Sequence, residues 1–393
     1  MERREFIKGL GASLVMLSSG VSTSALATDI KTNKKNLVWV MLRGALDPLH
    51  TVVPLKDDNL LTLRPTLAKS VVKNALALDN QFGLNPALAH LHKWYLDKQL
   101  LPIVAVSSGY ESRSHFDGQD YLECGGNLNN LDSGWLARSL SGLSNSVISN
   151  SKNSKQTSSA IAIANSTPIS LRGSNAVNTW YPANIKAADD DIYRQLNTLY
   201  QGDESLLQNL TDGLALKDTA MIDDSKKTSR KFIELAAACG NFLVKSNDID
   251  CAMLEMGGFD THNNQHKRLS KQLVELDSGL AALKSSLGSQ WNDTVVVIAT
   301  EFGRTVKENG TQGTDHGTGS AMFIAGGKVK GGKVLGDWPG LNTEQLFKQR
   351  DLQPTTNSFS WIASVLKQHW QLSDNAIAQV LPLHKAYDIK IME

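Results

Sequence analysis

Cysteine is scarce in this chain, with three residues among 393. Cys124, Cys239 and Cys251 are irregularly spaced and form no C-x-x-C pair, which excludes a zinc ribbon and a dithiol redox motif. Three thiols allow at most one disulfide, and the sequence does not decide which pair would form it. The simplest expectation is that all three are small, buried hydrophobic residues.

An excess of charge of either sign is also lacking. Forty Lys and Arg residues balance 39 Asp and Glu residues, for a formal net charge of +1. Proteins that bind nucleic acid usually carry a clear basic excess, so we expect no nucleic-acid partner. With 41% hydrophobic residues, a chain of this length can bury a large core.

After residue 27 the chain has no apolar run of the roughly 20 residues that a membrane-spanning helix needs. Residues 1–27 differ from the rest: a charged MERREFIK precedes the apolar GLGASLVMLSSGVSTS and the small residues A-L-A at 25–27, a pattern typical of a cleaved export signal. Arg3 and Arg4 make it similar to the twin-arginine type. We therefore predict export by the twin-arginine machinery and a periplasmic mature protein without a transmembrane segment.

What the chain does contain is an alternation of apolar strands and amphipathic helices. Continuous apolar runs predict buried strands at 36–43, 101–106, 160–164, 251–256, 294–300 and 320–327. Helical spacing of apolar residues predicts helices at 85–99, 226–245 and 264–286. Strands that are apolar throughout are covered on both faces, so we predict an α/β fold with a mostly parallel central sheet and helices on both faces, a three-layer sandwich.

We predict that residues 28–393 form a single domain with two irregular regions. Residues 140–159 are rich in Ser and Asn and are expected to be a surface loop. Residues near 187–247 are expected to form a helical insertion, which begins with an acidic stretch.

Polar side chains follow the predicted strands at the points where they end. Those singled out are Arg43, Asp47, Ser112, Arg113, Ser114, His115, Asp117, Asp260, His262, Glu301 and Arg304, together with Asp315 and His316 just before the last strand. If the strands are parallel and adjacent, these groups meet at one edge of the sheet. Carboxylates and imidazoles gathered there would bind one or two divalent ions such as zinc, manganese, calcium or magnesium.

Some of these residues also have a purely structural explanation. The glycines before Asp260 would permit a tight turn, and Asp260 could cap the helix predicted from 264. Arg113 and Arg304 could form surface ion pairs or bind an anion through their bidentate fork. His316 lies in a D-H-G triplet between a polar turn and a strand, where packing gives no reason for an imidazole.

Several segments resemble one bacterial family, known as domain of unknown function 1501, over essentially the whole chain after the leader. They are LRGALDPLH, FGLNPALAHL, SRSHFDGQD, SGWLAR, EMGGFDTH, TEFGRTVKENGTQGTDHGTGSAMFIAGG and GDWPGL. That family is similar to the alkaline phosphatase and sulfatase superfamily, whose members cleave or transfer phosphate and sulfate esters with two metal ions. The resemblance implies an alkaline-phosphatase-like fold.

The resemblance also implies roles for particular residues. It implies that Asp47, Asp260, His262, Glu301 and His316 hold metal, with His266 as a weaker alternative to His262. The position of the superfamily's nucleophile corresponds to Ser114 in preference to Ser112. Where the superfamily has an Asp-His pair this chain has Glu301 and Phe302, so one imidazole ligand is lost, and His115 or Asp315 could replace it.

The preferred hypothesis is therefore a metal-dependent hydrolase of small anionic phosphate or sulfate esters, with Ser114 attacking or supporting the attacking water and Arg113 or Arg304 neutralising the anion. A second hypothesis is a scaffold of the same fold without turnover, which binds a cell-envelope component. A serine hydrolase that uses Ser114 and His316 ranks last, because the chain lacks a G-x-S-x-G elbow there.

Overall fold

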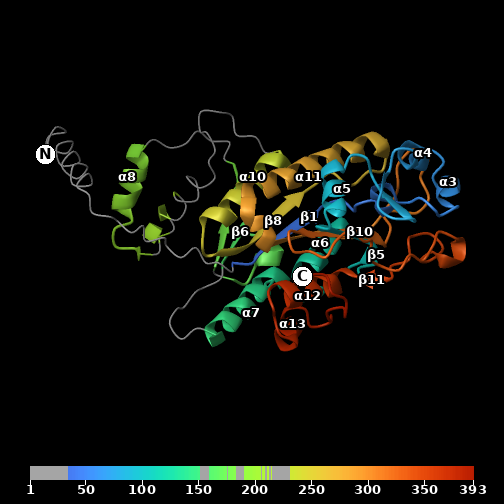
Figure 1. Ribbon diagram of the computed structural model, residues 1–393. Helices are drawn as coiled ribbons and strands as arrows, with labels where there is room; N and C mark the ends of the chain where they lie inside the picture. The colour runs from blue at the N-terminus through green and yellow to red at the C-terminus, as the bar shows by residue number, and fades with distance from the viewer. Residues whose placement is uncertain are drawn as a thin grey trace, which may run out of the picture. The chain divides into compact units, whose positions relative to one another are not determined.

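The continuous apolar runs form the strands of an eight-stranded sheet, as predicted (Figure 1). The strand order is β11-β5-β10-β9-β1-β8-β6-β7. The strands are β1 (Asn36–Leu42), β5 (Leu100–Ser107), β6 (Ser159–Ala162), β7 (Val177–Thr179), β8 (Ile249–Met256), β9 (Thr294–Thr300), β10 (Ser320–Gly326) and β11 (Thr356–Asn357). Neighbours pair in parallel except at β10, which runs antiparallel to both β5 and β9. The prediction of a mostly parallel sheet is confirmed.

The computed structural model describes part of the chain. The described residues are 34–150, 159–174, 176–182, 190–204, 206–208, 210, 211, 214 and 231–393. The export signal predicted at 1–27 therefore lies outside the described residues. Among the residues described, no helix combines the length and the apolar character needed to cross a membrane.

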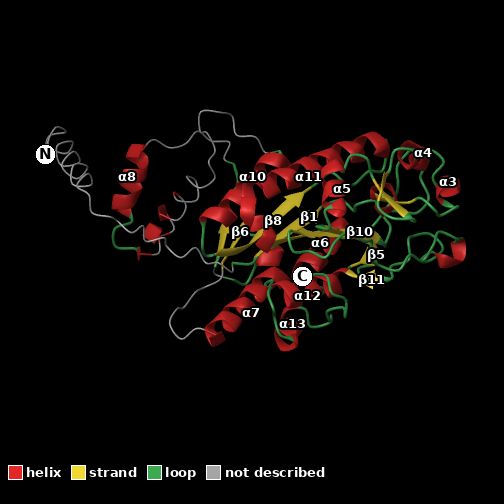
Figure 2. Ribbon diagram, in the orientation of Figure 1, coloured by secondary structure: helices red, strands yellow, loops and turns green. Residues whose placement is uncertain are grey.

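Helices cover both faces of the sheet, so the predicted three-layer arrangement is also confirmed (Figure 2). One layer contains α5 (Ala89–Leu96), α10 (Phe232–Lys245) and α11 (Gln265–Leu287). The other contains α6 (His115–Cys124), α7 (Trp135–Asn150), α12 (Ser358–His369) and α13 (Asp374–Val380). Further helices in the described part of the chain are α2 (Pro48–Thr51), α3 (Leu60–Leu63), α4 (Leu67–Val72) and α8 (Asp190–Leu199), and 3-10 turns are found at Ile169–Leu171, Gly288–Asp293 and Thr343–Gln345.

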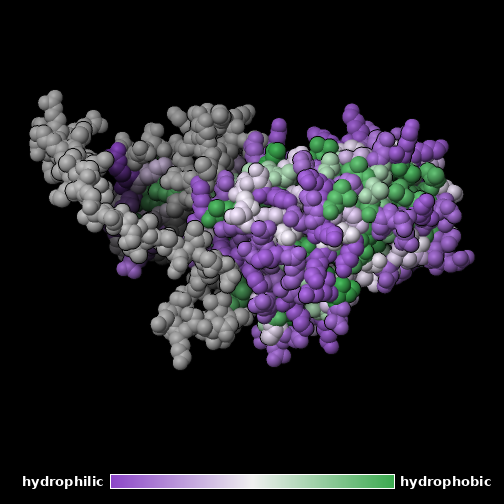
Figure 3. Space-filling view, viewed as in Figure 1, coloured by the Kyte–Doolittle hydropathy of each residue, from purple (hydrophilic) through white to green (hydrophobic). Residues whose placement is uncertain are grey.

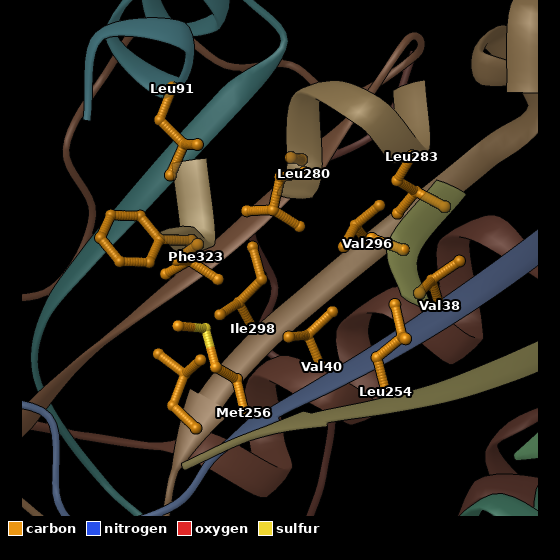
Figure 4. Close-up of a cluster of buried hydrophobic side chains, with 14 of the residues drawn as sticks. Val38, Val40, Leu91, Leu254, Met256, Leu280, Leu283, Val296, Ile298 and Phe323 are labelled. Carbon is orange, nitrogen blue, oxygen red and sulfur yellow. The ribbon is translucent and has the colours of Figure 1, made fainter. Parts of the chain in front are cut away.

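Alternation along each strand divides the core between these two layers. In β1, Val38 and Val40 face α5, α10 and α11, whereas Trp39 faces the opposite layer. The long helix α11 presents leucines spaced three or four residues apart, among them Leu280 and Leu283, to the first face (Figure 4). Strands buried on both sides are the physical reason for the continuous apolar runs.

A smaller antiparallel sheet lies apart from the central one. It has the order β2-β4-β3 and consists of β2 (Val52–Pro54), β3 (Leu76–Ala77) and β4 (Phe82–Leu84). On the face of the molecule seen in Figure 3, hydrophilic residues predominate and hydrophobic ones occur in small groups between them.

The loop expected at 140–159 is wrong for its first part. Residues 140–150 continue α7, and Ser159 already begins β6, while 151–158 lie outside the described residues. Buried Leu136 and Leu140, one helical turn apart, continue the amphipathic pattern from the first half of α7 into this segment. The Ser and Asn content of this segment therefore led to a wrong prediction, because the segment also carries the apolar residues of a helix face.

The three cysteines are free and buried, as the simplest expectation held. Burial raises the pKa of the Cys239 and Cys251 thiols, which keeps both groups neutral and unreactive.

His369 gives the fold a testable dependence on pH. The ring is buried, its Nε2 lies 2.9 Å from the carbonyl oxygen of Asn36, and burial lowers its pKa to about 4. In the unfolded chain the pKa is about 6.5, so between these values the unfolded state binds more protons and acid destabilises the fold. We expect the free energy of unfolding to fall by about 3 kcal/mol through this group as the pH drops from 6.5 to 4.

Urea unfolding of chelator-treated protein across this pH range would measure the effect. In His369→Gln, which keeps a donor for the Asn36 carbonyl but cannot titrate, the pH dependence should be shallower by that amount. Identical pH dependence in both proteins would show that His369 is not the titrating group.

Candidate metal centre

The carboxyl ends of the parallel strands form the edge where the predicted site residues lie. In the register of the sheet, Leu42 at the end of β1 is paired with Met256 of β8 and Thr300 of β9. Ser320, which begins β10, is paired with Val106 near the end of β5. Because β10 is antiparallel, the loop before it reaches the same edge as the loops that follow the other strands.

The turn EMGGFDTH brings Asp260 and His262 to this edge. It packs against Gly44 in the loop after β1, which has a φ of +112°. A Cβ atom at Gly44 would lie 2.5 Å from the backbone nitrogen of Asp260, so glycine is required for the two loops to approach. Gly44 therefore allows the two strand-end loops to come into contact.

His316 is placed by backbone pairing with the segment that follows β9. Residues Arg304 and His316 form an antiparallel bridge. The Gly317 N–H donates to the Gly303 carbonyl at 2.8 Å, and the Thr305 N–H donates to the Asp315 carbonyl at 2.8 Å. This pairing fixes the D-H-G triplet against the end of β9.

His115 comes to the same place from the loop after β5. Ser114 is the N-cap of α6, and its Oγ accepts a long hydrogen bond from the Asp117 N–H at 3.5 Å. His115 is thus the first residue of the helix and faces the other loops.

Four side-chain atoms converge at this point. The Nε2 atom of His316 lies 2.9 Å from Nε2 of His115 and 3.0 Å from Nε2 of His262. Oδ1 of Asp260 lies 2.9 Å from Nε2 of His262, 3.3 Å from Nε2 of His316 and 3.5 Å from Nε2 of His115. The four side chains are between 21% and 42% exposed, so a small ion or molecule can reach them from solvent.

Hydrogen-bond acceptors fix how these imidazoles present their nitrogens. Nδ1 of His115 lies 2.8 Å from Oε1 of Glu301, and Nδ1 of His316 lies 2.9 Å from the carbonyl oxygen of Arg113. Nδ1 of His262 lies 3.3 Å from Oδ1 of Asp315. These oxygens accept hydrogen bonds, so in each neutral ring the proton sits on Nδ1 and the lone pair on Nε2.

Three bare Nε2 atoms and a carboxylate oxygen therefore face one another, and their lone pairs repel unless a cation lies between them. Ligands 2.0–2.1 Å from a zinc ion would be about 3.3–3.4 Å apart in tetrahedral geometry, close to the separations found here. Histidines whose other nitrogen bonds a carboxylate or a carbonyl are typical of metal sites. The residues thus fit one divalent ion held by His115, His316 and Asp260, and His262 lies beside this group, within 3.0 Å of both His316 and Asp260.

The charges around the cluster favour the ionised carboxylates. Burial by itself raises the pKa of Asp260, but the hydrogen bond and charge of Arg304 outweigh it and the pKa is lowered. The hydrogen bond to Glu301 raises the pKa of His115, whereas partial burial lowers the pKa of His316. Asp260 is thus anionic, and it is not the helix cap considered as an alternative, since the N-cap of α11 is Asn264.

Glu301, predicted as a metal ligand, lies behind His115. It is fully buried, and Oε1 accepts hydrogen bonds from the Gly44 N–H at 2.8 Å and the Gln119 amide at 3.1 Å in addition to its contact with His115. Oε2 accepts from the Thr300 hydroxyl at 2.9 Å. With both oxygens bonded to protein donors, this carboxylate orients His115 rather than facing the cluster itself.

Asp47, also predicted as a ligand, is not brought to the cluster. Its carboxylate is fully buried, with Oδ2 2.6 Å from Nη1 of Arg64 and also bonded to Gln265. Oδ1 accepts from the Leu49 N–H at 3.1 Å. Arg64 in turn donates to the carbonyls of Thr305 and Val306. This pair therefore fastens the loop after β1 to the segment that carries Arg304.

The two arginines predicted to bind an anion have protein partners. Nη1 of Arg304 lies 2.6 Å from Oδ1 of Asp260, and its other nitrogens bond Thr314. Arg113 donates from Nε and Nη2 to Oδ2 of buried Asp351, at 3.1 and 2.7 Å. Arg113 has a φ of +59°, which is unusual for a residue with a side chain. Its backbone carbonyl oxygen accepts the hydrogen bond from Nδ1 of His316.

The role of Glu301 can be tested without any substrate. Glu301→Gln removes the charge behind His115 and places an amide group beside donors, so we expect the affinity for zinc to fall about 10- to 100-fold. Competition with a chromogenic chelator would measure this. Glu255→Gln, at an exposed carboxylate paired with Arg43 on the same edge of the sheet, is the matched control and should leave zinc affinity unchanged. Equal affinities in all three proteins would exclude a positioning role for Glu301.

Comparisons with known proteins give a match to one family model and several distant structural likenesses. A model described as "Protein of unknown function (DUF1501)" matches residues 97–381. No curated protein matches the chain. Ps i-CgsB, solved in complex with k-i-k-neocarrahexaose, gives a TM-score of 0.37 at 10% identity over 87% of this chain and 74% of that one. The PH0037 protein from Pyrococcus horikoshii gives 0.36 at 12% identity over 86% and 98%. Likenesses this distant support no statement about function.

Proposed function

The chain belongs to the DUF1501 family, and from the geometry of its site we propose that it is an exported, metal-dependent hydrolase of phosphate or sulfate esters. The observation that carries the proposal is the convergence of three imidazole Nε2 atoms on one carboxylate oxygen, with every Nδ1 held by an acceptor. A ligand set rich in nitrogen favours zinc or manganese over calcium and magnesium, which prefer oxygen ligands.

A divalent ion at this position would lower the pKa of water and offset the negative charge of an ester. The chain's own residues do the rest in this proposal. His115, His316 and Asp260 hold the ion with His262 beside them, and Ser114, covalently next to His115, attacks the ester or supports the attacking water. Arg304 maintains Asp260 as an anion, since it is bonded to the same oxygen that faces the imidazoles.

We further propose three features that the sequence predicts and that concern export, domain organisation and kinship. These are a twin-arginine leader at 1–27, a single periplasmic domain from residue 28 onward, and kinship with the alkaline phosphatase and sulfatase superfamily. The position of Asp260, His262 and His316 at one edge of a mostly parallel sheet supports this kinship.

A second candidate is a metal-binding scaffold without turnover that binds a cell-envelope component. It is favoured by the contacts of Arg113 and Arg304. Their guanidinium groups already donate hydrogen bonds to Asp351 and Asp260, respectively, instead of facing a substrate anion. The Ser114 hydroxyl also acts as a helix cap. In such a protein the metal would stabilise the loops rather than activate a nucleophile.

One experiment separates these candidates. The mature protein is stripped with a chelator, reloaded separately with zinc, manganese, calcium or magnesium, and its metal content measured by elemental analysis. Each form is then assayed with p-nitrophenyl phosphate and p-nitrophenyl sulfate. Hydrolysis that requires zinc or manganese supports the enzyme. Stoichiometric binding without hydrolysis of either ester supports the scaffold. Failure to retain any of the four ions contradicts both.

A further inference from the structure

A second polar cavity lies between the small sheet and the segment GDWPGL. Its volume is 530 Å³, within the range of about 300–1,000 Å³ found for small-molecule sites. The residues used below are Lys56, Asp58, Gln81, Phe82, Trp338 and Asn342, with Asp57 beside them. None of them belongs to the candidate metal centre, and the esterase proposal gives them no role.

Trp338 is held in this cavity by specific contacts. Its indole Nε1–H donates to Oδ2 of Asp57 at 3.1 Å. Its ring meets Phe82 edge to face, with centroids 5.4 Å apart and planes at 81°. Trp338 is half-buried, so the ring is fixed in position but still lines the cavity.

The loop that carries Trp338 is pre-organised. Pro339 restricts the backbone, and Gly340 has a φ of +88°. A Cβ atom at Gly340 would lie 2.3 Å from Oε1 of Gln345, which itself accepts from the Asn342 N–H in a capping box. Asn342 also accepts from the Asn59 amide at 3.1 Å, which ties the loop to the opposite wall. A cavity with fixed walls loses little entropy when it binds a ligand.

Other polar groups lining the cavity are free to bind a ligand. Among the described residues, the side chains of Lys56, Asp58 and Gln81 have no hydrogen-bond or ion-pair partner, and all three are exposed. They offer an ammonium donor, a carboxylate acceptor and an amide that is both donor and acceptor. Such a mixture suits hydroxyl groups, which also donate and accept.

The charged groups of the lining are two carboxylates and one ammonium group, which disfavour an anionic ligand. Asp57 and Asp58 oppose an anion, while Lys56 opposes a cation. A ligand with an apolar face for the indole and several neutral hydroxyls satisfies both the aromatic and the polar parts of the lining. We infer that this cavity binds a neutral saccharide unit through Trp338, Asp58 and Gln81.

Saturation-transfer NMR on the wild-type chain tests the inference with three soluble neutral probes: cellotetraose, maltotetraose and N,N′,N″-triacetylchitotriose. We expect saturation transfer to at least one of them. Its affinity should fall about tenfold or more in Trp338→Ala, because aromatic contact is lost. It should fall about two- to tenfold in Gln81→Ala, because a hydrogen bond to the sugar is lost.

Gln81→Ala keeps the test meaningful if Trp338→Ala disturbs the loop, since Gln81 is exposed and has no protein partner. Asn130→Ala, at an exposed amide outside the cavity, is the matched control and should bind like the wild type. The inference is overturned if no probe shows transfer, or if the Gln81 and Asn130 variants bind equally well. It is also overturned if tetramethylammonium binds this cavity and the sugars do not, since the site would then be a cation site.

Discussion

His316→Ala is expected to lower the affinity of the protein for zinc by at least about 100-fold, more than the loss typical of a residue that only supports a ligand. His316 is the central member of the cluster, because its Nε2 is within 3.0 Å of both other imidazole nitrogens. Removing it takes one of the imidazoles from the group and leaves His115 and His262 linked only through Asp260. If the protein hydrolyses esters, the metal-dependent activity should be lost together with the metal.

Chelator competition and elemental analysis measure this effect, and His92→Ala is the matched control. His92 lies on α5 with Nε2 2.8 Å from the carbonyl oxygen of Ala77, away from the cluster. We expect wild-type zinc affinity in this control. Wild-type zinc binding by His316→Ala would contradict the proposed ligand set outright, whatever happens to the activity.

Asp47→Asn is expected to destabilise the fold by about 3–5 kcal/mol while zinc affinity stays unchanged. The substitution preserves shape but leaves the guanidinium of Arg64 buried without its counter-charge. Burial by itself raises the pKa of Asp47, yet Arg64 lowers it, so the native carboxylate is charged. Loss of that charge therefore acts on folding rather than on metal binding.

Urea unfolding of the chelator-treated protein measures the loss of stability, and zinc competition measures the binding. Glu111→Gln is the control for the removal of an acidic charge. Glu111 pairs with Lys348 at 3.1 Å on the surface, where such a pair contributes at most about 1 kcal/mol. If Asp47→Asn instead lost most of its zinc affinity and kept its stability, Asp47 would be a metal ligand, as the sequence had suggested.

Local pattern was sufficient for most of the central sheet. The runs that became β1, β5, β8 and β9 are mostly apolar and buried, because helices cover the sheet on both sides, although Glu255 in β8 is exposed. The rule that ligands meet at the carboxyl edge then placed Asp260 and His262 correctly. Composition was a weaker guide, as the helical start of the Ser- and Asn-rich segment shows.

The roles of individual acids could not be predicted in the same way. Asp47 and Glu301 both follow strands at the correct edge, and the sequence alone does not distinguish a ligand from a group that supports one. The difference lies in their partners: Arg64 is 17 residues from Asp47 in the chain, and His115 is 186 residues from Glu301. Such pairings depend on how separate loops pack.

The sequence by itself determined the layers, most of the strands and the edge at which chemistry could occur, because burial and periodicity are local properties of a chain. The tertiary structure alone decided that β10 runs antiparallel, and this direction places His316 beside the loops that follow the other strands instead of at the far end of the sheet. It also decided which lone pairs face one another, since the proton on each imidazole is fixed by an acceptor from a distant segment. A shared ligand set is a property of packing, and no single stretch of this chain encodes it.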